Sequence, residues 1–322
     1  MKKTTAIFTW LGVFMLITTA CSSLMAQHHL KLTIRTEVLD YFPGFPIIAY
    51  VYLENLAYEY STPVVQCLEP EYGYVEYFVK TPSGKEIPFI PWAYKEHPDP
   101  VITLSPGHVI RREAKIFFGA NGWTFTQPGE YTLKAVYMKG VESNEWPFSI
   151  MTPCSDSEKK MVDLFLGSKE VGYFLLFEGG DHLVEGKKRL EEVAAQFYKS
   201  NFGTYANFVL GANLMKDFAN FKENRLRKAD PKLAIDYFEK SRFRSSGFHH
   251  GNFIPFSFHE AVYTHIYLEE ACRQLGQPER ANTVREELQT SVEQKMDEIY
   301  HDFREYKDFM KDILQQREKN KK

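Results

Sequence analysis

Phe125-Thr126-Gln127-Pro128-Gly129-Glu130-Tyr131 predicts a sharp bend that leads into a β-strand. Gly129 permits the bend because it has no Cβ, and the hydroxyl of Tyr131 can hydrogen-bond to nearby backbone. On both sides of this turn, from Leu30 to about Met151, apolar residues recur with a period of two and turn residues separate the runs. The pattern predicts an all-β domain of short strands over residues 27–151.

Three turn sequences resemble the recurring marks of bacterial immunoglobulin-like or fibronectin-like modules. They are Pro43-Gly44-Phe45-Pro46-Ile47, Leu104-Ser105-Pro106-Gly107 and the turn at Gly129, after which Tyr131 resembles a tyrosine corner. The resemblance implies that residues 27–151 form an immunoglobulin-like β-sandwich.

The second half of the chain has a helical pattern. Pro153, Ser155, Asp156 and Ser157 predict a linker at residues 152–160 that ends in a helix cap, and the hydrophobic period then becomes 3.6. Helices are expected near residues 159–177, 182–200, 205–221, 231–242, 258–275 and 278–316. The sequence therefore predicts a multidomain chain with an all-α domain at residues 161–322.

One helical turn, Leu275-Gly276-Gln277-Pro278-Glu279-Arg280-Ala281, resembles the turn of a tetratricopeptide repeat. The Trp, Tyr and Pro positions of a full motif are not kept, and the 34-residue period of that family is broken near residues 222–230. The resemblance implies a tetratricopeptide-like domain that binds other proteins.

The first residues are typical of an export signal. Lys2 and Lys3 precede an apolar run at residues 6–17, which is shorter than the roughly 20 residues that span a bilayer. Cleavage after Ala26 would leave residues 1–26 as a signal peptide. Alternatively, Thr18-Thr19-Ala20-Cys21-Ser22 resembles a lipobox, so that residues 1–20 would be removed and Cys21 lipidated. Both routes predict an envelope protein in the periplasm, at the outer membrane or outside the cell, with membrane contact only through the lipid.

Charge and cysteine content exclude several classes of function. Lys plus Arg total 39 and Asp plus Glu total 42, so no large positive field favours nucleic acid as a partner. Cys67 and Cys154 are the expected disulfide pair, while Cys272 lies on a helical apolar face and is expected to be a buried thiol. The sequence holds no Cys-x-x-Cys motif, so a redox or zinc-ribbon site is not expected.

The sequence contains no nucleophile elbow, phosphate loop or zinc helix in a supportive context, so neither a catalytic centre nor a cofactor or metal is expected. His249, His250, His259 and His265 are the nearest approach to a metal site. His259 and His265 are six residues apart and cannot share one helical face, so His265 is interpreted as a core residue with Glu269 as its partner. An envelope hydrolase or metal-dependent enzyme that uses residues 249–265 is an alternative.

The segment at residues 241–257 is longer than a repeat turn and mixes phenylalanines with positive side chains. We expect it to bind an acidic segment of an envelope partner through Arg242, Arg244, Phe248, His249, His250 and Phe253. The preferred function is therefore a noncatalytic envelope protein that binds another protein through its helical domain.

Other segments of the sequence suggest alternative binding roles. The loop at residues 91–100 could act as a protease inhibitor, and Trp92, Trp123 and Trp146 could stack on sugar rings. The last helix carries a seam for packing on its own domain or for a homodimer, formed by Met296, Ile299, Phe303, Tyr306, Met310 and Ile313.

The mass of the protein isolated from its native cells will distinguish the two processing routes. We expect a chain that begins at Gln27 or one that begins at an acylated Cys21. A full-length chain in the cytoplasm would contradict both.

Overall fold

The computed structural model describes residues 29–220, 224–242 and 258–299, with only the backbone described at residues 258–261 and 291–299. The chain forms two compact units, and the boundary between them falls between Leu176 and Phe177. The N-terminal part is rich in β-strands and the C-terminal part is helical, which confirms the predicted order of the two fold classes.

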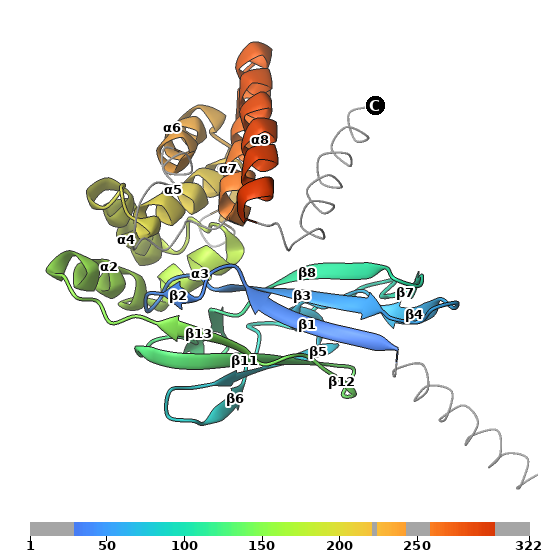
Figure 1. Ribbon diagram of the computed structural model, residues 1–322. Coiled ribbons are helices and arrows are strands. Elements are labelled where there is room, and N and C mark those ends of the chain that lie inside the picture. The colour runs from blue at the N-terminus through green and yellow to red at the C-terminus, as the bar shows by residue number, and fades with distance from the viewer. Residues whose placement is uncertain (1–28, 221–223, 243–257, 300–322) are drawn as a thin grey trace, which may run out of the picture. The chain divides into compact units, whose positions relative to one another are not determined.

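Two sheets form the main body of the first unit (Figure 1). One has the order β1-β3-β8, with strands β1 (Leu30–Thr36), β3 (Ile48–Asn55) and β8 (Val109–Lys115). The other has the order β2-β13-β11-β5-β6, with β12 paired to β11, and its strands are β2 (Asp40–Tyr41), β5 (Val75–Lys80), β6 (Glu86–Pro88), β11 (Gly129–Tyr137), β12 (Val141–Glu142) and β13 (Trp146–Ile150). Neighbouring strands are antiparallel except β13 and β2.

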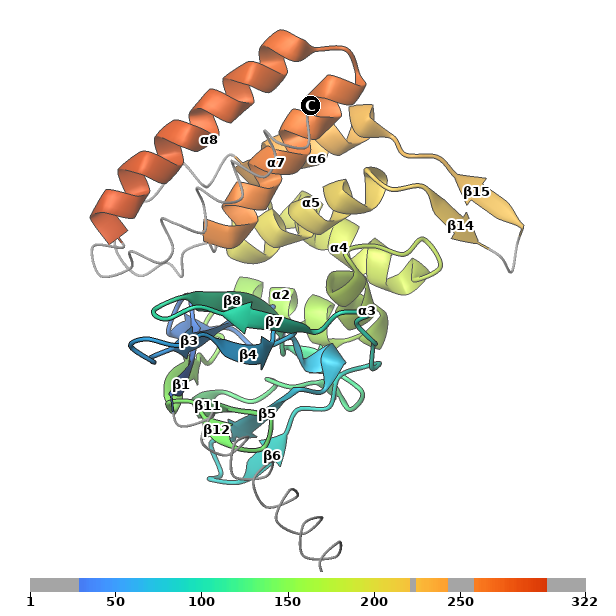
Figure 2. The ribbon, with the colours of Figure 1, turned by 90° about the vertical axis from the view of Figure 1, so that its right-hand side faces the viewer.

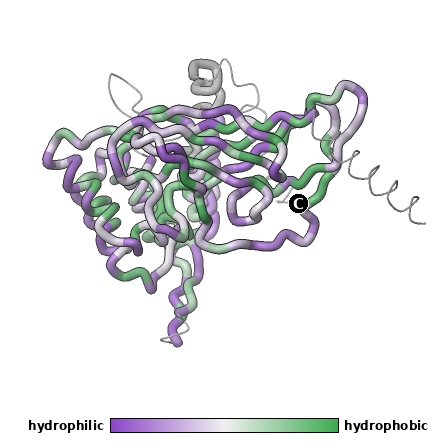
Figure 3. The backbone as a smooth tube through the Cα atoms, turned by 90° about the horizontal axis from the view of Figure 1, so that it is seen from below, coloured by the Kyte–Doolittle hydropathy of each residue, from purple (hydrophilic) through white to green (hydrophobic). Residues whose placement is uncertain are grey.

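The core lies between these sheets, since β1, β5 and β11 bury every second residue while β3 is buried along almost its whole length. Figure 3 shows apolar and polar stretches mixed along the backbone. Fully buried side chains from both sheets include Ile34, Val51, Leu53, Val79, Leu133 and Ala135. The Gly129 turn has the expected geometry, with φ at +135° and the Tyr131 hydroxyl donating to the carbonyl of Gln127 at 3.0 Å. The local prediction at this turn is confirmed.

Shorter elements connect the two sheets. The strand β4 (Thr62–Val65) pairs with β7 (Val101–Leu104), and β9 (Phe118–Gly119) pairs with β10 (Gly122–Trp123) in a tight hairpin. A 3₁₀ turn, η1 (Pro70–Tyr72), precedes β5.

Two helices complete the first unit, α2 (Asp156–Leu166) and α3 (Lys169–Phe177). Ser155 and Glu158 form the predicted cap, in which each side chain accepts a hydrogen bond from the other residue's backbone N–H. The helix α2 places Phe165 and Leu166 against Gly44, and the ring of Tyr173 in α3 lies 4.9 Å from that of Phe118. The division between the two compact units falls near the end of α3, and both helices contact residues of the β-rich part. The linker at residues 152–160 stays a prediction.

The described residues of the second unit form consecutive helices and a hairpin (Figure 2). The elements are α4 (Val184–Gln196), α5 (Asn201–Leu214), β14 (Phe218–Asn220), β15 (Arg225–Arg227), α6 (Pro231–Arg242), α7 (Phe258–Gln274) and α8 (Pro278–Ile299). Each helix packs on the next along the chain. The bounds of α6 agree with the prediction, but α5 ends at Leu214 because the following residues form β14 instead of continuing the helix. None of the helices in the described part of the chain is both long and apolar enough to cross a membrane.

The predicted disulfide is not formed, since Cys67 and Cys154 are both free thiols. Cys67 is buried beyond the end of β4, whereas Cys154 is exposed before α2 and its sulfur contacts the carbonyl of Thr152 at 3.3 Å. Burial, helped by the charge of Glu69, raises the pKa of the Cys67 thiol. Cys272 is buried as predicted.

This arrangement predicts strongly unequal thiol reactivity. In the folded protein a maleimide should label Cys154 rapidly, whereas Cys67 and Cys272 should react only after unfolding, because the reagent must reach a thiolate. Labelling followed by mass spectrometry measures this, and Cys154→Ser should abolish the fast phase. If unfolded, unreduced protein exposed fewer than these three thiols, a disulfide would exist and the assignment would be wrong.

Candidate functional site

The binding segment predicted from the sequence can be placed only in part. Arg244, Phe248, His249, His250 and Phe253 lie outside the described residues. Arg242 ends α6, where its guanidinium bonds Glu239 at 2.8 Å and also Glu287, and Glu239 in turn accepts a bond from Arg280 at 2.9 Å. Arg242 therefore ties α6 to α8, a structural role that the sequence did not indicate.

The histidine cluster is also only partly described, because the side chains of His249, His250 and His259 lie outside the described residues. His265 is buried on α7, with 6% of its surface exposed. Among the side chains that the structure describes, no three His, Cys, Asp or Glu residues are grouped as they would be around a metal ion.

Glu269, the expected partner of His265, accepts hydrogen bonds from Arg273 at 3.0 Å and from Arg285. Burial alone would raise the pKa of this carboxyl, but the two guanidinium groups hold it below its ordinary value. Glu269 is thus held in its ionised form between α7 and α8.

The three tryptophans predicted as sugar-stacking candidates have different surroundings. Trp92 is 47% exposed, while Trp123 and Trp146 are half-buried. The indole N–H of Trp146 donates to the hydroxyl of Thr36 at 3.0 Å, which links β13 to β1. Trp146 therefore has a structural role, and the three rings do not form one exposed platform.

The loop that carries Trp92, residues 89–100, is held by backbone hydrogen bonds along its length. The carbonyl of Ile90 accepts from Ala120 at 2.9 Å, and the N–H of Lys95 donates to Glu71 at 2.7 Å. At the far end, the carbonyl of Pro100 accepts from the backbone of Gln66 at 2.8 Å. The loop is thus an ordered feature of the first unit, and we name it the tryptophan loop.

The tryptophan loop lies so close to the β9–β10 hairpin that Gly119 can have no side chain. A Cβ there would lie 2.2 Å from the carbonyl oxygen of Ile90. Despite these attachments, the loop exposes large apolar side chains, with exposed fractions of 41% for Ile90, 47% for Trp92 and 68% for Tyr94. An anchored backbone that presents exposed aromatic rings is a typical recognition surface.

A series of edge-to-face ring contacts supports the loop from beneath. The ring of Trp92 lies 4.7 Å from that of Tyr173 in α3, which contacts Phe118, and Phe118 lies 5.3 Å from Trp123. Such contacts contribute about 0.5–1.5 kcal/mol each beyond the area they bury. The half-exposed ring of Trp92 is therefore packed against α3 on one side.

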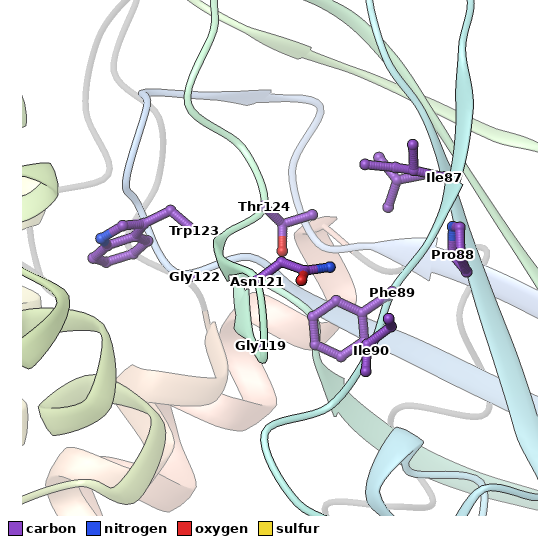
Figure 4. A pocket seen from close by; sticks show the side chains of 10 residues that line it. Ile87, Pro88, Phe89, Ile90, Gly119, Asn121, Gly122, Trp123 and Thr124 are labelled. Carbon is purple, nitrogen blue, oxygen red and sulfur yellow. The ribbon is translucent and has the colours of Figure 1, made fainter.

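A small cavity adjoins the tryptophan loop (Figure 4). Its volume is about 80 Å³, and its lining includes Ile87, Pro88, Phe89 and Ile90 on one side and the β9–β10 hairpin on the other. Figure 4 shows the indole of Trp123 turned away from Ile87 and Pro88. The cavity is small beside the roughly 300–1,000 Å³ of pockets that take drug-sized ligands, so it suits a single apolar side chain.

The second unit contains a partly buried polar cluster that sequence analysis did not find. The carboxylate of Asp181 accepts hydrogen bonds from Asn213 at 3.1 Å and from Arg227, and lies 3.5 Å from the ammonium group of Lys187. Arg227 also donates to the carbonyl of Asn213 at 2.9 Å, and the Asn213 amide oxygen accepts from Gly180. These bonds connect the segment before α4, the end of α5 and β15, so the cluster is a structural clasp.

Comparisons with known proteins do not identify a function. No protein-family model matches the chain, and no curated protein is similar to it. Solved structures that resemble part of the chain include an alkylpurine DNA glycosylase of Pseudomonas fluorescens bound to DNA, with TM-score 0.27 and 17% identity over 40% of this chain and 33% of that one. A β-glucosidase of Erythrobacter marinus has TM-score 0.25 and 14% identity over 38% of this chain and 15% of that one. A CARDB domain from Pyrococcus furiosus has TM-score 0.20 and 17% identity over 38% of this chain and 90% of that domain.

The matched region covers well under two thirds of the glycosylase and of the glucosidase. At these TM-scores none of the three likenesses bears on the activity of this chain.

The clasp at Asp181 predicts a pH-dependent contribution to stability. Burial alone would raise the pKa of this carboxyl, but hydrogen bonds from Arg227 and Asn213 and nearby positive charges hold it below its ordinary value. Asp181→Asn should therefore lower the free energy of unfolding at neutral pH by about 1 kcal/mol, a figure reduced for the partial exposure of the group.

Because the folded-state pKa of Asp181 is lowered, its contribution is complete above the unfolded pKa and is lost as pH falls through the folded value. The difference between the wild-type protein and Asp181→Asn should shrink towards about pH 3. Urea unfolding at several pH values measures it, with the exposed Asp236→Asn as a matched control. If the difference in unfolding free energy between the wild-type protein and Asp181→Asn did not change with pH, Asp181 would not be the ionised centre of the clasp.

Proposed function

We propose that this chain is a noncatalytic, exported envelope protein that binds another protein, and that the tryptophan loop is a contact surface. The observation that carries the proposal is the exposure of Trp92 and Tyr94 on a backbone that is fastened at Ile90, Lys95 and Pro100. Exposed aromatic side chains on a preorganised loop lose little entropy on binding, and Trp and Tyr are enriched among residues that dominate binding energy.

The cavity beside the loop supports a protein as the partner. Its walls are mainly apolar and include Phe89 and Ile90 at the start of the tryptophan loop, and its volume of about 80 Å³ would accept one side chain of a partner. Glu96 and Lys95 are exposed in the same loop and would supply a polar rim.

We infer the finer identity of each unit from particular contacts. The hydrogen bond from Tyr131 to Gln127 and the two facing sheets support an immunoglobulin-like sandwich. In the helical unit, Gly276 has φ at +69° between α7 and α8, and Ala281 is fully buried where these helices meet. Both features suit a tetratricopeptide-like turn.

Two further roles are compatible with the arrangement of the helices and of the tryptophan loop. The consecutive packing of α4 to α8 would offer a second protein-binding surface. Binding through residues 241–257 stays a prediction from the sequence. An anchored, exposed loop at residues 91–100 is also the form in which a protease inhibitor would present itself, and a panel of envelope and host proteases tests that role directly.

Replacing both exposed rings tests the proposal. Trp92→Ala combined with Tyr94→Ala should reduce recovery of the cross-linked partner from intact cells by at least about tenfold, because such anchors each contribute on the order of 2 kcal/mol. Quantitative mass spectrometry of the captured protein measures the loss.

The matched control is Tyr198→Ala, since this tyrosine of the helical unit is 44% exposed. It should leave recovery unchanged, and the melting temperature of the double variant should stay within a few degrees of the wild type. Unchanged recovery with the double variant would reject the loop as the contact surface. If partner recovery fell only when residues 241–257 were changed, the contact surface would lie in the helical unit.

A further inference from the structure

A second exposed loop lies at the end of the first unit where β1 begins. Asn55, which is fully buried at the end of β3, determines the shape of residues 56–60. Its amide group donates to the carbonyls of Tyr60 at 3.1 Å and Leu104 at 2.9 Å, and its oxygen accepts from the backbone of Ala57 at 3.0 Å. The amide thus bonds residues at both ends of this loop and also connects it to the end of β7, and we name residues 56–60 the tyrosine loop.

The tyrosine loop turns large apolar side chains outwards. Ala57 is 4% exposed, whereas Leu56 is 54%, Tyr58 92% and Tyr60 47% exposed. Burying Ala57 beneath the loop thus forces its larger neighbours to the surface. Tyr is enriched at the boundary between water and a bilayer, where its apolar ring and polar hydroxyl are both satisfied, and Leu is common on the apolar side of interfacial segments.

The N-terminal segment of the mature chain joins the first unit beside this loop. The backbone of Leu56 donates to the carbonyl of His29 at 2.7 Å, and the ring of His29 lies 5.1 Å from that of Tyr60. Cys21 precedes His29 by eight residues in the sequence, so the two cannot be further apart than roughly 28 Å in a fully extended chain. A lipid on Cys21 would therefore keep the tyrosine loop close to the membrane.

We propose that the tyrosine loop is the membrane-facing end of the protein, with Leu56, Tyr58 and Tyr60 resting in the headgroup region of the lipid bilayer. The proposal depends on the proposed export and on acylation of Cys21, and it is independent of the tryptophan loop. The lipid supplies the affinity by tethering, and the three side chains determine which end of the unit touches the membrane.

The charges around the loop indicate that the contact is apolar rather than electrostatic. Lys31 is 4.0 Å from Glu54, and Glu59 is exposed within the loop itself, so positive charge does not dominate. The nearby turn after β11 adds an exposed apolar residue, Met138, at 44% exposure, and β12 beyond it contacts β1. The loop should accordingly contact zwitterionic lipid as well as anionic lipid.

Site-directed fluorescence on the acylated full-length mature protein tests this orientation. Tyr58→Cys in a Cys154→Ser background is labelled with an environment-sensitive dye, and the protein is reconstituted into phosphatidylcholine vesicles that contain nitroxide-labelled lipid. Cys67 and Cys272 are buried and should stay unlabelled.

The matched control is Ser83→Cys in the same background. Ser83 is exposed in the turn after β5, and β5 starts at Val75 opposite Tyr137, so this turn lies at the other end of the sheet. We expect the dye at position 58 to shift to shorter wavelength and lose most of its emission to the nitroxide, while the dye at position 83 does neither.

Each other outcome overturns the proposal at a different step. If the measured mass shows no acyl group on Cys21, the protein lacks the lipid anchor on which the proposal depends. If the protein is acylated but neither dye is quenched, or both dyes are quenched, the proposed orientation of the first unit on the membrane is wrong. A spectral shift at position 58 in native envelopes but not in protein-free vesicles identifies a protein as the neighbour of the loop. None of these results bears on the tryptophan loop, whose test uses partner recovery.

Discussion

The burial of two sheet faces against each other is the constraint on which the first unit depends. Apolar side chains from β1, β3, β5 and β11 fill the space between the sheets, and this burial is the main favourable contribution to folding. The exposed aromatic residues of this unit occur in the tryptophan loop and the tyrosine loop.

Both loops owe their order to polar groups that are satisfied locally. Asn55 holds the tyrosine loop through its amide, and backbone hydrogen bonds at Ile90 and Lys95 hold the tryptophan loop. A buried amide without partners would cost on the order of 1–3 kcal/mol, so these bonds are strongly required. The loops can therefore expose apolar rings without collapsing onto the unit.

Charged residues in the helical unit behave differently from what their positions in the sequence suggest. Arg242 joins Glu239 and Glu287 across two helices, and its predicted contact with a partner stays a prediction. Asp181, Asn213 and Arg227 form a clasp from residues that lie more than thirty positions apart at its extremes. Charged groups in this unit thus connect neighbouring elements of the fold.

The sequence by itself determined the order of β-rich and helical parts, the Tyr131 turn, the Ser155 cap and the bounds of α6, because periodicity, turns and caps depend on residues a few positions apart. Only the tertiary structure decided that α2 and α3 belong to the first unit, that Cys67 and Cys154 are free, and that the residues before α6 form a hairpin. These features depend on contacts between residues that are far apart in the sequence, and such contacts form only when long loops close. Local sequence patterns carry no information about these contacts.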